Sequence, residues 1–131
     1  MNENLTLKKQ AELLTLKDVL DARDRIKDTC VNTKLIYSSQ FSKDSGNDVY
    51  IKPENLQITG SFKLRGALNK VSKLSDDKKK KGLIASSAGN HAQGLAYAAG
   101  RLGIKATIVM PKSTPLIKVQ ATRNYGADVV L

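Results

Sequence analysis

One lysine in the sequence stands where its amine could act as a nucleophile. Lys63 follows the turn residues Gly60-Ser61-Phe62 and opens an apolar stripe with helical spacing. At about 100° per residue, Lys63 lies roughly 75° from the centre of this stripe, nearer to it than Lys70 or Arg65. Partial burial beside the positive end of a helix favours the neutral, nucleophilic amine. The alternative is that Lys63 extends into solvent. The stripe consists of Leu64, Ala67, Leu68, Val71 and Leu74.

A second candidate is the loop Ser86-Ser87-Ala88-Gly89-Asn90-His91-Ala92-Gln93-Gly94. Its small residues let a backbone approach an anion closely, and it leads into a helix whose free N–H groups attract a carboxylate or phosphate. Its spacing matches neither a Walker loop nor the dinucleotide-binding glycine fingerprint. The alternative is that Ser87 or Asn90 only caps the helix and that His91 is a structural histidine.

Both candidates need a sheet that presents them at one edge. Four apolar runs predict strands at residues 49–51, 82–86, 106–110 and 128–131, and helices are predicted between them. This alternation predicts an α/β fold with an open, twisted parallel sheet and helices on both faces. Ligands of such sheets bind at the carboxyl ends of the strands, so Lys63 and Asn90 should face one cleft.

The first 45 residues follow a different pattern. Thr15-Leu16-Lys17-Asp18 predicts a capping box that opens a helix ending near Lys27. An extended stretch at residues 33–37, a short helix at 38–43 and a turn at 44–48 follow. The chain ends on an apolar strand at Leu131, and a parallel sheet needs more cover than one N-terminal helix supplies. We therefore expect the chain to be part of a longer protein.

Composition excludes several classes of protein. With 40% hydrophobic and 26% charged residues, the 131-residue chain is not disordered along its length. No apolar run is long enough to cross a membrane, and Met1–Leu5 lacks the pattern of a secretory signal. The single cysteine, Cys30, excludes an internal disulfide and a thiolate metal cluster. These features predict a cytoplasmic protein without a metal site or a membrane partner.

The net charge of +10 raises the question of nucleic-acid binding. Its densest run, Lys78–Lys81, follows Ser75-Asp76-Asp77 and precedes Gly82, which predicts one short helix with charges matched to its dipole. With no tryptophan and only Phe41 and Phe62 as phenylalanines, the chain is poorly suited to stack on bases. We predict no nucleic-acid partner, and the positive charge also suits a protein that handles small anions.

Two motifs closely resemble those of the threonine dehydratases, which are pyridoxal-phosphate enzymes of the tryptophan-synthase-β fold type, or fold type II. The segment Gly60-Ser61-Phe62-Lys63-Leu64-Arg65-Gly66-Ala67 resembles their lysine motif, and Ser86–Gly94 resembles their asparagine loop. Lys52-Pro53-Glu54-Asn55-Leu56-Gln57 and Val109-Met110-Pro111 match as well. The resemblance runs from about Leu16 to Leu131.

The resemblance implies a role for each matching residue. Lys63 would bind pyridoxal 5'-phosphate covalently and remove the Cα proton of the substrate. Phe62 would lie beside the pyridine ring, and Asn90 would donate a hydrogen bond to the phenolic oxygen. The substrate carboxylate would be bound by Ser87, Ala88, Gly89, Asn90 and His91.

The implied activity is dehydration and deamination of L-threonine or L-serine to 2-oxobutanoate or pyruvate and ammonia, by a homo-oligomer. Serine racemases of this fold carry a serine where Ala88 stands. The cysteine-synthase relatives carry aspartate in place of Leu64 and threonine in place of His91. A racemase-like enzyme and a non-catalytic module that binds a small anion are the alternatives.

The resemblance also implies how the chain divides. Residues 1–45 would be the incomplete N-terminal segment of a larger domain, and residues 46–131 a truncated small domain that binds the cofactor. The glycine-rich phosphate loop and the partner of the pyridine nitrogen lie downstream of Leu131 in the family. We therefore expect residues 1–131 alone to be inactive.

Overall fold

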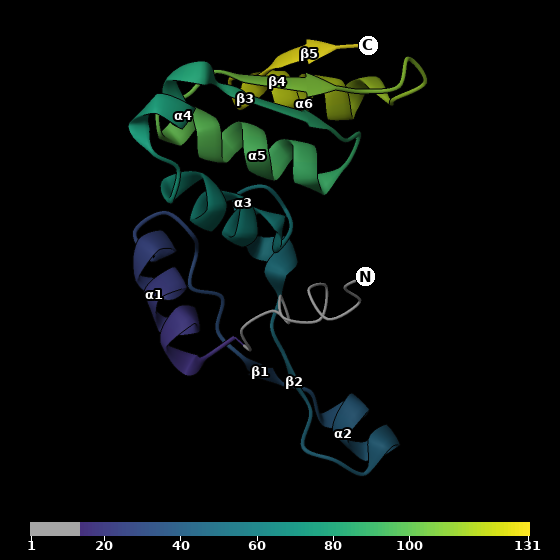
Figure 1. Cartoon of the computed structure of the whole chain (residues 1–131). Helices are drawn as coiled ribbons and strands as arrows, with labels where there is room; N and C mark the ends of the chain where they lie inside the picture. The colour runs from purple at the N-terminus through teal and green to yellow at the C-terminus, as the bar shows by residue number, and fades with distance from the viewer. Residues whose placement is uncertain (1–13) are drawn as a thin grey trace, which may run out of the picture.

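The computed structural model describes residues 14–131, which form a parallel α/β unit preceded by a smaller N-terminal part (Figure 1). Residues 1–13, including the N-terminus that is predicted to lack a secretory signal, lie outside the described residues. Strands β3 (Leu83–Ser86), β4 (Ala106–Val109) and β5 (Asp128–Val130) pair in parallel, in the order β3-β4-β5. The predicted α/β class with an open parallel sheet and helices is confirmed.

The helices of this unit lie between the predicted strands, as expected. They are α3 (Lys63–Ser72), α4 (Asp76–Lys81), α5 (Asn90–Arg101) and α6 (Leu116–Asn124). Four of the five residues of the apolar stripe on α3 are buried, namely Leu64, Ala67, Leu68 and Val71. The lysine run forms α4, as predicted, between two acidic residues in its first turn and Gly82 at its end.

The hydrophobic core lies on both sides of α5. This helix contacts α3 on one side and strands β3 and β4 on the other, so it lies between α3 and the sheet (Figure 1). The sheet face toward the core carries Ala106 and Ile108, both buried. The opposite face carries Ile84, Val109 and Val130, and within residues 14–131 Ile84 remains 76% exposed. The parallel sheet is thus well covered by described residues on one face.

The strand that was predicted at residues 49–51 does not join the parallel sheet. Strand β2 (Tyr50–Ile51) pairs antiparallel with β1 (Ile36–Tyr37), so the parallel sheet has three strands instead of the expected four. The rings of Tyr37 and Tyr50 meet edge to face at 5.4 Å across this ribbon. Such cross-strand pairs stabilise a local antiparallel pairing, which needs no crossover helix.

The N-terminal part otherwise follows the predicted pattern. Helix α1 (Leu16–Ile26) begins at Thr15 with the predicted capping box, in which Asp18 is the reciprocal partner. Helix α2 (Ser39–Ser45) ends at Gly46, whose φ of 68° is left-handed. In Figure 1, α2 and the β1–β2 ribbon extend away from the parallel sheet. The division between residues 45 and 46 stays a prediction.

Among residues 14–131, no helix has the length and apolar character needed to cross a membrane. The same part of the chain contains no group of three or more histidine, cysteine or acidic side chains that could hold a metal ion.

We expect Gly100→Ala to destabilise the fold by about 1–3 kcal/mol. A Cβ at Gly100 would lie 2.7 Å from the carbonyl oxygen of Tyr125, so the backbone after α6 would have to move. The matched control is Gly66→Ala in α3, where a Cβ would meet nothing within 4 Å. Alanine favours a helix over glycine, so this control should gain about 0.5–1 kcal/mol. Denaturant unfolding measures both, and an equal change in the two variants would contradict the close approach at Gly100.

Candidate active site

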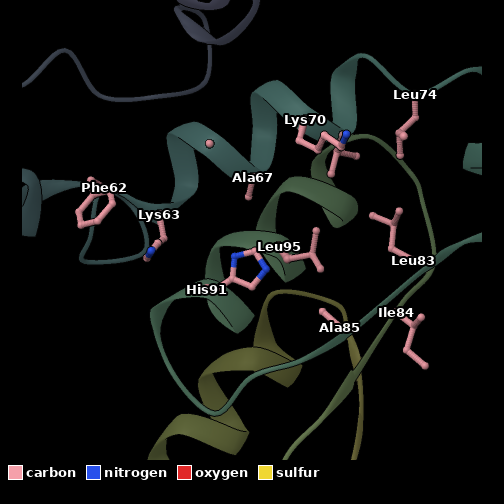
Figure 2. Close-up of a pocket in the computed structure, with 12 residues that line it drawn as sticks. Phe62, Lys63, Ala67, Lys70, Leu74, Leu83, Ile84, Ala85, His91 and Leu95 are labelled. Atoms are coloured by element: carbon pink, nitrogen blue, oxygen red, sulfur yellow. The ribbon is translucent and has the colours of Figure 1, made fainter. Parts of the chain in front are cut away.

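A cavity beside strand β3 collects three of the predicted site residues. Phe62 and Lys63 from the start of α3 and His91 from the first turn of α5 line it together (Figure 2). Its remaining wall is largely apolar and includes Val71 and Leu95, with a second amine, Lys70, farther along α3. A polar end beside an apolar wall is typical of sites that bind a small molecule with an aromatic or aliphatic part.

Lys63 lies at the first helical position of α3 and is exposed. Its Nζ atom lies 4.9 Å from the centroid of the Phe62 ring, so the amine and the aromatic face are neighbours. The partial burial that the helical periodicity predicted is not observed. Helical periodicity places a side chain on a face of a helix but does not show whether another segment covers that face, and among residues 14–131 the Lys63 side chain is left exposed.

The loop between β3 and α5 ends in a helix start without a side-chain cap. Gly89 is the N-cap residue in an extended conformation, and no side chain hydrogen-bonds there. The Ser87 Oγ accepts a hydrogen bond from the Gly89 N–H at 3.3 Å, which organises the loop and leaves the helix start free. First-turn N–H groups lack partners within a helix and attract anions. Capping by Asn90, the simpler alternative, is excluded because Asn90 is itself the first helical residue.

The predicted site residues are therefore gathered only in part. Ser87, Ala88 and Gly89 are half-buried in the loop, whereas Asn90 and His91 are exposed. His91 lines the cavity with Lys63, but Ser87, Ala88, Gly89 and Asn90 are not among its lining residues. The assigned roles of Lys63, Phe62, Asn90 and the loop residues stay predictions.

These residues fit pyridoxal phosphate in their chemistry. A primary amine is the group that captures its aldehyde, and Lys63 supplies one at the cavity. Phe62 offers an aromatic face next to that amine. The uncapped start of α5 offers N–H donors to an anionic group.

A polar network that sequence reasoning missed holds the other side of α3. The Arg65 guanidinium binds the Glu54 carboxylate twice, through Nε–Oε2 and Nη2–Oε1, each at 2.8 Å. Glu54 belongs to the short 3-10 helix η3 (Glu54–Leu56), and its side chain is only 16% exposed. The signal in the sequence was the match at Lys52–Gln57, which carried no role of its own.

The same turn also fixes the segment that precedes β1. Gln57 is buried and donates from Nε2 to the carbonyl of Val31 at 2.7 Å, while its Oε1 accepts from the Val31 N–H at 3.1 Å. The Lys52 Nζ donates to the carbonyl of Thr33 at 2.7 Å. Residues 52–57 therefore connect α3 to residues 31–33 through side chains.

We expect the network to make the fold sensitive to acid. Hydrogen bonds from Arg65, and secondarily from Thr33, lower the pKa of Glu54 from 4.5 to about 2. A carboxyl whose pKa is lowered by folding stabilises the fold above its unfolded pKa, and the gain is lost as the pH falls through the folded value. The free energy of unfolding should therefore drop between about pH 4.5 and pH 2, by about 3 kcal/mol from this group.

Urea unfolding across this pH range measures the drop, and Glu54→Gln is the control. The variant should be less stable at neutral pH and should lose less stability on acidification than the native chain. An identical pH dependence in the two proteins would contradict the role of Glu54.

The one cysteine of the chain lies beside this network. Cys30 is buried, and burial raises the pKa of its thiol above the ordinary value. A protonated thiol is a poor nucleophile, and Cys30 packs in the hydrophobic core beside the network.

Comparison with known proteins connects this geometry to a family. A family model described as "Pyridoxal-phosphate dependent enzyme" matches residues 26–131. The L-threonine ammonia-lyase of Thermotoga maritima is 52% identical over 119 residues, which are 91% of this chain and 30% of that relative.

Solved structures agree in fold. The processed form of threonine deaminase isoform 2 from Solanum lycopersicum matches with a TM-score of 0.79 and 46% identity, covering 86% of this chain and 33% of that one. Serine racemase from Dictyostelium discoideum matches with a TM-score of 0.84 and 39% identity, covering 89% of this chain and 38% of that one. The chain thus spans about a third of the length of these relatives.

Proposed function

The chain belongs to the family of pyridoxal-phosphate dependent enzymes, and on this basis we propose that the whole protein deaminates L-threonine, and L-serine as a second substrate. The products are 2-oxobutanoate, or pyruvate from serine, and ammonia. The β-hydroxyl group leaves as water, and one water is taken up when ammonia is released. The relatives named for threonine deamination support the choice of substrate.

The observation that carries the proposal is the position of Lys63. Its side chain lines one cavity with His91, and His91 lies in the first turn of α5, whose start has no side-chain cap. Lys63 supplies an amine at this cavity, and the N–H groups at the start of α5 lie in the same helical turn as His91, which lines it. This pairing suits an α-amino acid, which has a carboxylate to bind and a Cα proton to remove.

Pyridoxal phosphate, when bound, supplies an electron sink that makes the Cα proton of an amino acid acidic. The residues of this chain supply the rest. The Lys63 Nζ accepts the proton from Cα, since a free primary amine is a base. The N–H groups at the start of α5 bind the carboxylate and orient Cα toward Lys63. Phe62 covers one side of the amine, and Asn90 would donate a hydrogen bond to the cofactor, as the family resemblance implies.

A serine racemase-like activity is the second candidate, because the Dictyostelium discoideum enzyme shares the fold at 39% identity. Racemisation needs a proton donor on the face of Cα opposite Lys63. The methyl side chain of Ala88 has no ionisable proton to donate, whereas the resemblance places a serine there in racemases. Residue 88 therefore favours deamination.

The test uses the purified full-length protein with pyridoxal phosphate and L-threonine. We expect release of 2-oxobutanoate and ammonia in equal amounts, with no accumulation of D-amino acid in a chiral separation. A D-amino acid as the main product would replace the proposal with the racemase alternative. A non-catalytic anion-binding module would show neither product, and no visible absorbance band that borohydride abolishes.

Location and assembly belong to the same proposal. The composition favours a cytoplasmic enzyme, and the family resemblance favours a homo-oligomer. Cell fractionation tests the first, and light scattering of the full-length protein tests the second.

A further inference from the structure

Arg65 and Lys63 leave the first turn of α3 in different directions. Residues two positions apart on a helix point about 200° away from each other. A side chain that binds Arg65 therefore holds the turn from the side away from Lys63. The guanidinium of Arg65 meets both carboxylate oxygens of Glu54 and also donates from Nη2 to the carbonyl of Val31 at 3.0 Å. A planar guanidinium bound at both ends of a carboxylate fixes direction as well as distance.

Glu54 is in turn held by groups outside α3. The hydroxyl of Thr33, which is buried, donates to Oε1, and the Nζ of Lys52 lies 3.9 Å from the same oxygen. With its side chain 16% exposed, Glu54 is shielded from the water that would otherwise weaken these contacts. The carboxylate therefore has a fixed position relative to residues 31–33.

The opposite side of the turn is fixed by α5. A Cβ at Gly94 would lie 3.1 Å from the carbonyl carbon of Lys63 and 3.1 Å from the nitrogen of Leu64. The backbone of Lys63 thus touches α5 directly, without a side chain between them. The first turn of α3 is held between α5 and the Glu54–Arg65 pair, although the Lys63 side chain itself is exposed.

We propose that Glu54 is a positioning residue for Lys63: acting through Arg65, it sets the position from which the Lys63 amine reaches into the cavity. The inference rests on the proposed function, since it assumes that Lys63 binds the cofactor. Glu54 itself touches neither cofactor nor substrate. A displacement of about 1 Å at a reacting group costs about a hundredfold in rate, so loosening this turn should impair capture of the cofactor and turnover together.

The test compares Glu54→Gln with Gln57→Ala in the full-length apoprotein. Glu54→Gln keeps the size of the side chain and removes the charge that binds Arg65. Gln57→Ala removes two hydrogen bonds to Val31 from the same turn but leaves both Glu54–Arg65 bonds in place. Both variants should lose stability in denaturant unfolding, so stability alone does not separate them.

The separating measurement is the capture of pyridoxal phosphate by Lys63. Visible absorbance follows the rate, and borohydride followed by peptide mapping identifies the modified lysine. We expect Glu54→Gln to slow capture about tenfold or more and to lower kcat with little change in KM, and Gln57→Ala to capture at close to the native rate. Capture by Glu54→Gln at the native rate, or an equal loss in Gln57→Ala, would overturn the proposal.

Two further variants secure the result. If Glu54→Gln does not fold, Glu54→Asp keeps the charge on a side chain that is one methylene shorter. This variant should show a smaller loss of the capture rate, and capture at the native rate would count against the proposal.

Glu54→Ala combined with Arg65→Ala should slow capture no more than either change alone, because both changes break the same contact. Additive losses in the capture rate would contradict this. A native protein that captures the cofactor at Lys63 without deaminating threonine would refute the proposed function and leave the capture comparison intact.

Discussion

Replacing Lys63 with alanine in the full-length protein is expected to abolish threonine deamination, with a fall in kcat on the order of 10⁴-fold or more. Within the described residues, Lys63 is the amine at the start of α3 that shares its cavity with His91. Without it, no side chain at that position can bind the cofactor covalently or accept the Cα proton. Release of 2-oxobutanoate measures the loss, and borohydride should no longer attach the cofactor to the protein.

The matched control is Lys73→Ala. Lys73 lies at the other end of the same helix, is exposed and is not among the residues that line the cavity. The Lys73→Ala variant should keep turnover and capture of the cofactor close to native levels. Normal turnover in Lys63→Ala would end the assignment of this lysine, whatever the control shows.

Residues 1–131 prepared alone are expected to show no measurable threonine deamination. Lys63, Asn90 and His91 are exposed in this chain, so water screens their contacts with a charged ligand and reorganises freely around them. The phosphate of the cofactor needs several N–H donors, and the family resemblance places those donors downstream of Leu131. We therefore expect weak cofactor binding together with the loss of turnover.

The same preparation should self-associate. Apolar side chains are exposed on the sheet and on the first turn of α6, where Ile84, Leu116 and Ile117 are 76%, 81% and 79% exposed. Apolar surface of this kind drives association in water. A calibrated sizing column, run beside the full-length protein, measures the result. A monomer with stoichiometric cofactor and robust turnover would contradict both expectations.

Local patterns predicted most of the elements correctly, because they depend on neighbours in the sequence. The capping box at Thr15 and the apolar stripe through Leu64 and Leu68 each act within one or two helical turns. The same holds for the strands of the parallel sheet, whose short apolar runs follow Gly82, Gly103 and Gly126. Parallel pairing then followed from the alternation of strands and helices.

The errors concern contacts between distant residues. Val49-Tyr50-Ile51 has the composition of a buried strand, and nothing local shows that Tyr50 pairs with Tyr37. The exposure of Lys63 depends on which segments lie over the start of α3. The Glu54–Arg65 pair also requires a folded turn between its partners, so the residues of Lys52–Gln57 were noticed as a match without a physical role.

The order of the strands has a consequence for how the chain assembles. Neighbours in the sheet are also successive in the sequence, so β4 pairs with β3, and β5 with β4, each after a single helical crossover. Parallel sheets fold slowly when their strands are far apart in the chain, and this one avoids that entropic cost. By contrast, the hydrogen bond from Arg65 to the carbonyl of Val31 joins residues that are far apart in the sequence, so it closes a long loop. This bond can form only after α3 has folded. The α3–β5 unit can therefore nucleate by itself, with residues 31–33 docking afterwards, so that assembly runs from the sheet back toward the N-terminus.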